Sequence, residues 1–169
     1  AQHKRFELRE IAAFVLGQLG TPICPFARES YPLLLELLKD DYHEVVAAAL
    51  LALGALKSLG HADDERIASA IAEQADSADE DVREAVAYSL GFWNCGSTET
   101  VISRLLDDDS AIVRAASEFS LELRAARAGL EGGGDANHKE QVHPAAGSRD
   151  RADRGVTRSD DDVQNLSHK

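Results

Sequence analysis

The sequence contains no methionine and only two cysteines, and aromatic residues make up 5% of its 169 positions. A β-sandwich needs more aromatic, valine and threonine residues than this, so a composition dominated by alanine and leucine favours a helical protein. Cys24 and Cys95 lie far apart in the chain, and we interpret them as reduced thiols of a cytoplasmic protein. Because the chain starts at Ala1 without a methionine, we expect a processed or trimmed product, and a removed N-terminal signal stays open.

Long apolar runs and an excess of positive charge are also missing. No apolar run approaches the roughly 18 residues that a transmembrane helix needs, so the sequence predicts no contact with a membrane. Acidic residues outnumber basic residues by 30 to 18, which gives a net charge of −12. Because phosphate contacts need lysine and arginine, this balance disfavours nucleic acid as a partner.

The apolar residues become scarce after residue 127. Residues 129–169 contain no aromatic side chain and little leucine or valine, so they cannot bury enough surface to offset the entropy lost on ordering. We therefore expect a folded domain at residues 1–127 and a disordered polar tail at residues 128–169. Three histidines of the tail are irregularly spaced, and we expect no metal site in it.

A ten-residue pattern with a helical apolar period recurs in the folded region. Three copies, each closed by a glycine, stand 37 residues apart, and a fourth follows after a shorter spacing of 31 residues. The fourth copy has Glu122 where the others have glycine. A second apolar segment precedes each of the last three copies and shifts register with them, which predicts a repeated helix pair. The copies occupy residues 8–17, 45–54, 82–91 and 113–122.

The repeat predicts an all-α solenoid of about three and a half antiparallel helix pairs. Small residues on the buried stripes let neighbouring helices approach closely, and we interpret the single Trp93 as a core residue. The second helices of the pairs are expected at residues 6–20, 43–59, 80–94 and 111–127, and the first helices at residues 25–39, 63–76 and 98–107.

The copy at residues 82–91 reads Val-Arg-Glu-Ala-Val-Ala-Tyr-Ser-Leu-Gly, and the copy at residues 8–17 is similar. This pattern resembles the second helix of HEAT repeats, particularly the short HEAT-like repeats of the phycocyanobilin-lyase type. The resemblance covers about residues 6–127. It implies a right-handed superhelix in which the second helices line the concave side.

The resemblance also implies a ladder of polar contacts along the solenoid. In this ladder Arg83 and Arg114 would bind acidic residues of the turn that precedes their helix, such as Asp79 and Asp109. Val46 takes the place of the arginine in the second copy, so we expect the ladder to be interrupted there.

Three other activities known on HEAT-like folds lack support in the residues. Deoxyhypusine hydroxylases, which residues 14–19 resemble, hold iron with His-Glu pairs, but none of the four copies has such a pair at the corresponding place. DNA glycosylases of this class use a positive concave surface, whereas acidic residues stand there in this sequence. A bilin lyase has no short signature to match, and neither cysteine has a histidine close in sequence. We therefore expect no catalytic residue, no bound metal and no cofactor.

The side chains beside the buried stripe of the second helices remain as a candidate binding site. They form a column of large apolar groups that the resemblance places on the concave side, and two glutamates border it. Such a column suits a protein or peptide partner with apolar anchors and basic flanks. The alternative is that these residues only complete the contacts between helices. The candidate residues are Phe14, Leu51, Tyr88, Phe92, Phe119, Glu10 and Glu84.

We therefore predict a non-catalytic protein-interaction or scaffold module. An accessory subunit of an enzyme, such as a bilin lyase-type or other protein-modification factor, is the alternative. The start of the chain adds a second expectation, because only five residues precede Phe6 and leave no room for a helix before the first copy. Its outer face would be uncapped, which predicts a longer array, a partner or self-association at this end.

Overall fold

The computed structural model describes residues 4–59, 64–96 and 98–132, and seven α-helices account for most of this part of the chain. These described residues include no strand, as the alanine- and leucine-rich composition predicted. None of the described helices combines the length and the apolar character that crossing a membrane requires. The elements are α1 (Phe6–Gln18), α2 (Ala27–Leu37), α3 (His43–Ser58), α4 (Glu65–Ala72), the 3₁₀ helix η1 (Glu73–Asp76), α5 (Glu80–Leu90), α6 (Thr98–Leu105) and α7 (Ala111–Gly132).

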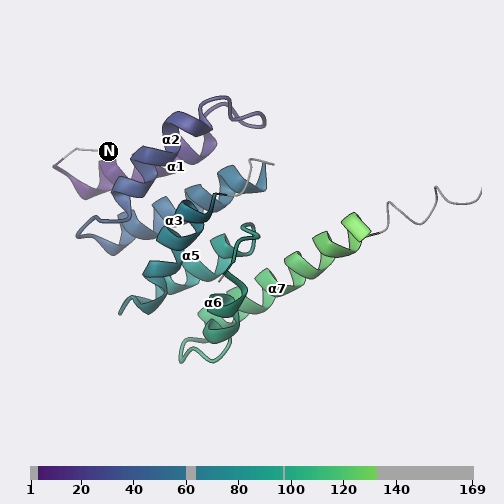
Figure 1. The fold of residues 1–169 in the computed structure, drawn as a ribbon. Helices are drawn as coiled ribbons and strands as arrows, with labels where there is room; N and C mark the ends of the chain where they lie inside the picture. The colour runs from purple at the N-terminus through teal and green to yellow at the C-terminus, as the bar shows by residue number, and fades with distance from the viewer. Residues whose placement is uncertain (1–3, 60–63, 97, 133–169) are drawn as a thin grey trace, which may run out of the picture. The chain divides into compact units, whose positions relative to one another are not determined.

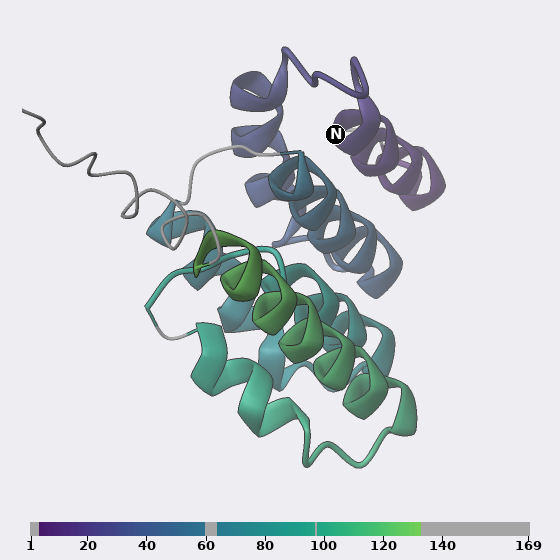
Figure 2. The ribbon, with the colours of Figure 1, turned by 90° about the vertical axis from the view of Figure 1, so that its right-hand side faces the viewer.

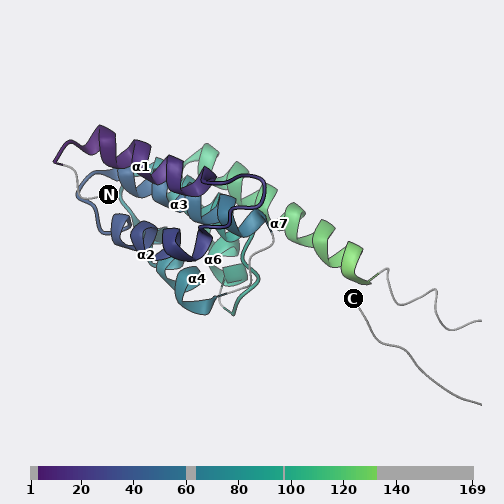
Figure 3. The ribbon, with the colours of Figure 1, turned by 90° about the horizontal axis from the view of Figure 1, so that it is seen from above.

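The described helices form two layers. Four helices, α1, α3, α5 and α7, follow one another in what we call the main row (Figure 1), and each packs on the next. Seen from above, α2, α4 and α6 lie in a second layer beneath this row (Figure 3). Figure 2 shows α1 at one end of the row, next to α3, and α7 towards the other end. The described residues thus form an all-α solenoid, which confirms the predicted fold class.

Aliphatic side chains fill the space between the layers, together with one aromatic pair formed by Tyr31 of α2 and Trp93, which follows α5. Trp93 is completely buried, as predicted, and its ring meets the ring of Tyr31 edge to face at 6.3 Å. Burial raises the pKa of Tyr31 to about 12. The largest of the other fully buried side chains are Leu34, Leu50, Leu53, Leu56, Ile71, Leu90 and Ile102.

Glycine allows the helices of the main row to approach each other closely. A Cβ atom added at Gly17 would lie 2.7 Å from the Cβ of Ala52, and one added at Gly91 would lie 2.6 Å from the Oγ of Ser120. The Ser120 hydroxyl donates a 2.8 Å hydrogen bond to the backbone carbonyl of Ala87 on the preceding helix. Each contact therefore needs a glycine on one helix and a small residue on the next.

Two arginines connect successive turns along the edge where the main-row helices begin. Arg9 donates hydrogen bonds of 2.6 and 2.7 Å to both carboxylate oxygens of Asp40, and Arg83 contacts Asp108 in the same way at 2.8 and 2.9 Å. All four side chains are largely buried. Hydrogen bonding to the guanidinium groups lowers the pKa of both carboxyl groups.

The ladder predicted for Arg83 and Arg114 is confirmed in part, since Arg114 contacts Asp109 as expected, but through the backbone carbonyl of that residue. Arg83 and Arg114 do reach back to the turn before their helix, but they donate hydrogen bonds to its backbone carbonyls, at residues 77–78 and 108–109. The carboxylate of Asp79 is instead occupied as the N-cap of α5, where it accepts hydrogen bonds from two backbone N–H groups of the first turn.

The ladder is interrupted in the second copy, and both partners change there together. Val46 occupies the arginine position and is buried. Ser77 occupies the position that Asp40 and Asp108 hold in the neighbouring copies. Because Ser77 replaces the aspartate, Val46 does not leave a carboxylate at that position without its arginine.

The helix bounds differ most from the predicted ones in three of the helices. The helix predicted at residues 63–76 changes to a 3₁₀ helix after Ala72, and α5 ends at Leu90 because Gly91 begins a turn of tighter backbone hydrogen bonds. In contrast, α7 continues past residue 127 to Gly132 through arginine and alanine residues, which favour helix. The rest of the predicted tail, residues 133–169, lies outside the described residues.

We expect Gly17→Ala to lower the free energy of unfolding by about 1–3 kcal/mol, because the new methyl group would push against the backbone of α3. Gly129→Ala is the matched control, since Gly129 lies within α7 and an added Cβ would meet nothing within 4 Å. Because alanine favours helix more than glycine does, the Gly129→Ala variant should be more stable by up to about 1 kcal/mol. Urea denaturation of both variants measures the difference, and equal stability would contradict the close-contact account.

We expect Asp108→Asn to lower the free energy of unfolding at pH 7 by about 1.5 kcal/mol, because the charged hydrogen bonds to Arg83 are lost. The lowered pKa of Asp108 means that its contribution is present above the usual carboxyl pKa of about 4 and is lost as the pH falls further. Denaturation between neutral and acid pH should therefore show a smaller loss of stability in the variant. Asp64→Asn, whose partner Arg66 is highly exposed, should have less effect.

Candidate protein-interaction surface

One face of the main row carries a column of large, exposed side chains, one from each helix. Phe14, Leu51, Tyr88 and Phe119 occupy the same register position in α1, α3, α5 and α7, and between 37% and 66% of each is exposed. Leu50, next to Leu51 in sequence, is completely buried in the core. The four residues, which we call the exposed column, therefore present apolar surface to solvent while their neighbours hold the helices together.

The part of the exposed column on α5 and α7 is an ordered aromatic cluster. The rings of Tyr88 and Phe119 are stacked, with centroids 5.6 Å apart and planes inclined by 6°. The half-buried Phe92 meets Tyr88 edge to face at 5.4 Å, and the guanidinium of Arg127 lies 5.1 Å from the centre of the Phe92 ring. Because these rings support one another, little side-chain freedom is left to be lost when a partner binds.

The part of the exposed column on α1 and α3 borders an open groove of about 570 Å³ between these two helices. The groove is open because the alanines of α3 that line it have small side chains. Phe14, Ile11 and Leu51 supply its apolar surface, and two glutamates of α1 add negative charge. The groove is lined by Glu7, Glu10, Ile11, Phe14, Gln18, Ala48, Leu51, Ala52 and Ala55.

The predicted site residues fall into two groups on this surface. Phe14, Leu51 and Glu10 line the groove between α1 and α3. Glu84, Tyr88 and Phe119 line a shallower hollow of about 240 Å³ between α5 and α7, and Phe92 joins them through its contact with Tyr88. In both groups a glutamate lies beside the apolar side chains, so each hollow can receive an apolar group that is next to a positive charge.

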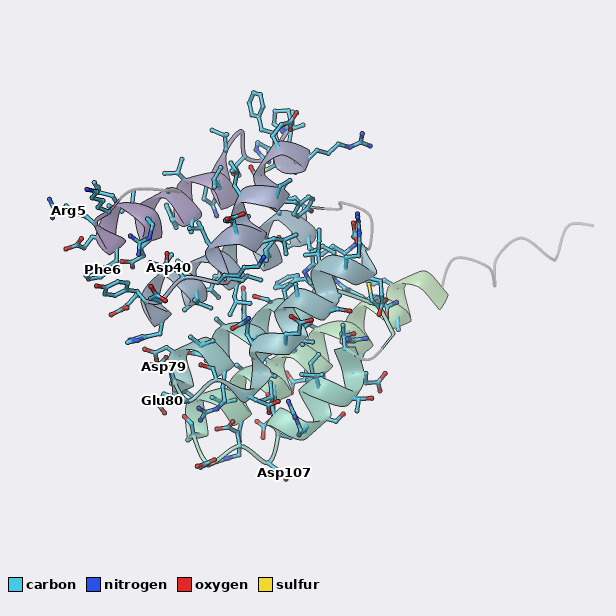
Figure 4. The ribbon with its side chains drawn as sticks, turned by 60° about the vertical axis from the view of Figure 1, so that its left-hand side comes forward. Arg5, Phe6, Asp40, Asp79, Glu80 and Asp107 are labelled. Atoms are coloured by element: carbon cyan, nitrogen blue, oxygen red, sulfur yellow. The ribbon has the colours of Figure 1, made fainter. Side chains whose placement is uncertain are left out.

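Acidic residues follow the edge of the solenoid at which the main-row helices begin. Figure 4 shows Asp40, Asp79, Glu80 and Asp107 along this edge, from the turn before α3 to the turn before α7. Negative charge at the start of a helix is favoured by the helix dipole, so part of this pattern stabilises the fold. It also places negative potential at one end of each hollow described above.

Basic residues gather where α3 and α5 end, and sequence reasoning did not identify this group. Arg124 and Arg127 of α7 and Lys57 of α3 line a hollow of about 620 Å³. Arg124 donates a 2.9 Å hydrogen bond to Thr98, and Lys57 lies 5.6 Å from the centre of the Trp93 ring. The spacing of Arg124 and Arg127, three residues apart on one helix, was the available signal.

The described residues offer little for catalysis or metal binding. They contain no group of three or more histidine, cysteine, aspartate or glutamate side chains arranged to hold a metal ion. Both cysteines are buried, and neither takes part in a disulfide within the described residues. His43 lies at the start of α3 with half of its side chain exposed, 3.4 Å from Glu44 and 3.5 Å from Asp79.

Three family models match consecutive parts of the chain. The model of the PBS lyase HEAT-like repeat matches residues 8–40, that of the HEAT repeat matches residues 31–59, and that of HEAT repeats matches residues 54–122. The chain belongs to the HEAT-repeat family. No curated protein matches the sequence.

The HEAT repeats include every residue of the exposed column, since the matches run from residue 8 to residue 122. Repeats of this kind form scaffolds for protein–protein interactions in general. Because a fold does not determine what it binds, the partner of this chain depends on the side chains of its own surface.

We expect Leu51→Ala to lower the free energy of unfolding by less than about 1 kcal/mol, whereas Leu50→Ala should lower it by about 2–5 kcal/mol. The two leucines are adjacent on α3, but only Leu50 is completely buried. Thermal or urea denaturation measures both values. A loss for Leu51→Ala as large as that for Leu50→Ala would show that the column serves the packing of the helices.

Proposed function

We propose that this HEAT-repeat chain is a non-catalytic binding module that holds a protein or peptide partner on the exposed column. The observation that carries the proposal is the alignment of Phe14, Leu51, Tyr88 and Phe119, which places one exposed large side chain on each of four successive helices. Apolar and aromatic groups of this kind provide most of the binding energy at protein interfaces.

The charges around the column support a partner with basic residues beside its apolar ones. Glu7 and Glu10 line the groove next to Phe14, and Glu84 lines the hollow next to Tyr88. Lysine or arginine in the partner would be attracted to these positions, which would also set its orientation and raise its rate of association. The same charges oppose nucleic acid, because its phosphates would face carboxylates.

The fold supports this function by holding the column rigidly. The contact between Gly17 and Ala52, together with the ion pair between Arg9 and Asp40, sets α1 against α3 on either side of the groove. A preformed surface loses less conformational entropy when a partner binds, so a given contact area yields more affinity.

One observation favours a second candidate function, an accessory subunit of a bilin lyase-type or other protein-modification enzyme. The PBS lyase HEAT-like repeat matches residues 8–40. Cys24 and Cys95, the only thiols of the chain, are both buried, which argues against a role for them as nucleophiles. The purified chain mixed with a bilin should gain a protein-bound visible absorbance band under this alternative, and no band under our proposal.

A library of displayed random peptides, selected on the 169-residue chain, tests the binding function. We expect the selected peptides to carry lysine or arginine within one helical turn of a bulky apolar residue. Tyr88→Ala should weaken their binding by about 30-fold, because it removes the ring that stacks on Phe119 and supports Phe92. Fluorescence anisotropy with a labelled peptide measures the affinity.

Leu33→Ala is the control, since Leu33 is as exposed as Leu51 but belongs to α2 in the other layer. This variant should bind the selected peptides with unchanged affinity. Peptides without basic residues, or binding that survives both Tyr88→Ala and Phe14→Ala in variants of unchanged helicity, would contradict the proposed surface.

A further inference from the structure

The hollow of about 620 Å³ where α3 and α5 end, which we call the basic hollow, is positively charged in a strongly acidic chain. Its described lining includes three basic side chains, those of Lys57, Arg124 and Arg127, and one carboxylate, that of Glu99, which gives a net charge of +2. The two hollows along the exposed column carry glutamates instead, and the described residues that line them include no basic side chain. Positive charge is therefore concentrated at the basic hollow, although the net charge of the chain is −12.

The two arginines of the basic hollow are hydrogen-bonded to neutral acceptors. Arg124 donates to the hydroxyl of Thr98 at 2.9 Å and to the side-chain oxygen of Asn94 at 3.2 Å, and Arg127 donates to the backbone carbonyl of Phe92 at 3.5 Å. Among the described residues, neither arginine forms an ion pair with a carboxylate. They differ in this from the two arginines that connect successive turns at the opposite edge, each of which holds an aspartate.

The surrounding contacts hold both guanidinium groups in place. Thr98 is buried and donates its own hydrogen bond to the backbone carbonyl of Cys95 at 2.7 Å, which fixes the acceptor of Arg124. The guanidinium of Arg127 lies 5.1 Å from the centre of the Phe92 ring. Each guanidinium has more N–H donors than these contacts use. Because both side chains are half-buried, the remaining donors have lost part of their hydration and can form strong, charge-assisted hydrogen bonds to an anion.

The charges of the basic hollow also oppose one another. Arg124 and Arg127 stand three residues apart on α7, where like charges repel. They lie on the part of this helix that continues past the end of its neighbours in the main row (Figures 1 and 3). Lys57 lies in the last turn of α3, where the helix dipole already favours a cation, so we infer the site from the two arginines. A bound anion would relieve the repulsion between them.

The neutral part of the lining indicates the class of anion. Phe92, Leu121 and Leu130 supply apolar surface next to the arginines, and 81% of Leu130 is exposed. A hollow of this volume is of the size that holds an organic ligand or a short stretch of chain, and a single inorganic anion would fill only a small part of it. A peptide with two carboxylates beside an apolar side chain matches both the charge of +2 and the apolar surface.

We propose that the basic hollow binds an acidic peptide segment of a partner protein, in which neighbouring aspartate or glutamate residues stand beside an apolar residue. The carboxylates accept hydrogen bonds from Arg124 and Arg127, and the apolar side chain packs on Leu121 and Leu130. This site takes a charge opposite to the one expected at the exposed column, and its binding does not depend on the proposed function.

Fluorescence anisotropy of the 169-residue chain with a rhodamine-labelled peptide, Leu-Glu-Glu-Leu-Glu-Glu, measures this binding. We expect the matched glutamine peptide, Leu-Gln-Gln-Leu-Gln-Gln, to bind at least about 10-fold more weakly, because it lacks the carboxylates. Arg124→Gln and Arg127→Gln should each weaken binding of the glutamate peptide by about 10-fold or more, since each removes a charged donor. Circular dichroism checks that both variants keep their helicity.

Arg104→Gln is the matched control, because it removes the same charge at the other end of α6, where Arg104 is paired with Asp76 at 3.0 Å. This variant should bind the glutamate peptide with unchanged affinity. Phe14→Ala should also leave that affinity unchanged while it weakens binding of the basic peptides expected at the exposed column. Failure of this proposal and failure of the proposed function are therefore distinguishable.

Several outcomes would overturn the proposal. The absence of binding at millimolar peptide, or equal binding of the glutamine peptide, would show that the basic hollow does not recognise carboxylates. Undiminished binding by folded Arg124→Gln and Arg127→Gln variants would place the peptide elsewhere on the chain. Displacement of the peptide by an equal concentration of inorganic phosphate would indicate a general anion site, and tighter binding of a single-stranded oligonucleotide would indicate nucleic acid as the ligand.

Discussion

The close contact between consecutive main-row helices is the constraint on which the rest of the structure depends. At Gly17 and Gly91 the backbone of the neighbouring helix, or a small side chain on it, lies where a Cβ would be. A glycine costs helix stability wherever it occurs, so its use within or at the end of three successive helices is explained by the packing that it permits. Because each contact has the same register, each helix is set on the last one in the same way.

The surface follows from this packing. When the buried positions of four helices are in register, the positions beside them are in register as well, and Phe14, Leu51, Tyr88 and Phe119 come to share one face. The paired side chains of Arg9 and Asp40, and of Arg83 and Asp108, fix the edge at which the helices begin. Acidic residues that cap or precede the helices give that edge its negative charge, so the same residues stabilise the fold and shape the electrostatics of the site.

Most of the fold could be predicted from the sequence, because a repeat reports its geometry through its own spacing. Copies separated by 37 and 31 residues, with matching apolar stripes in both segments, indicated the helix pairs and placed Trp93 in the core. The partners of Arg83 could not be predicted in the same way. Its carboxylate partner, Asp108, lies 25 residues further along the chain, in the turn before α7. The nearer carboxylate, that of Asp79, caps the start of α5 instead. Similarly, the contact of Arg127 with Phe92 depends on α7 being longer than the helix it packs on.

In the proposed function, stacked repeats align one side chain from each main-row helix into a single binding surface. Nuclear magnetic resonance of the chain, labelled at its phenylalanine, tyrosine and leucine side chains and titrated with a selected peptide, tests this claim most directly. We expect one peptide to shift the signals of Phe14, Leu51, Tyr88 and Phe119 together, with a common affinity. Shifts confined to α2, α4 and α6, or at one member of the column alone, would contradict it.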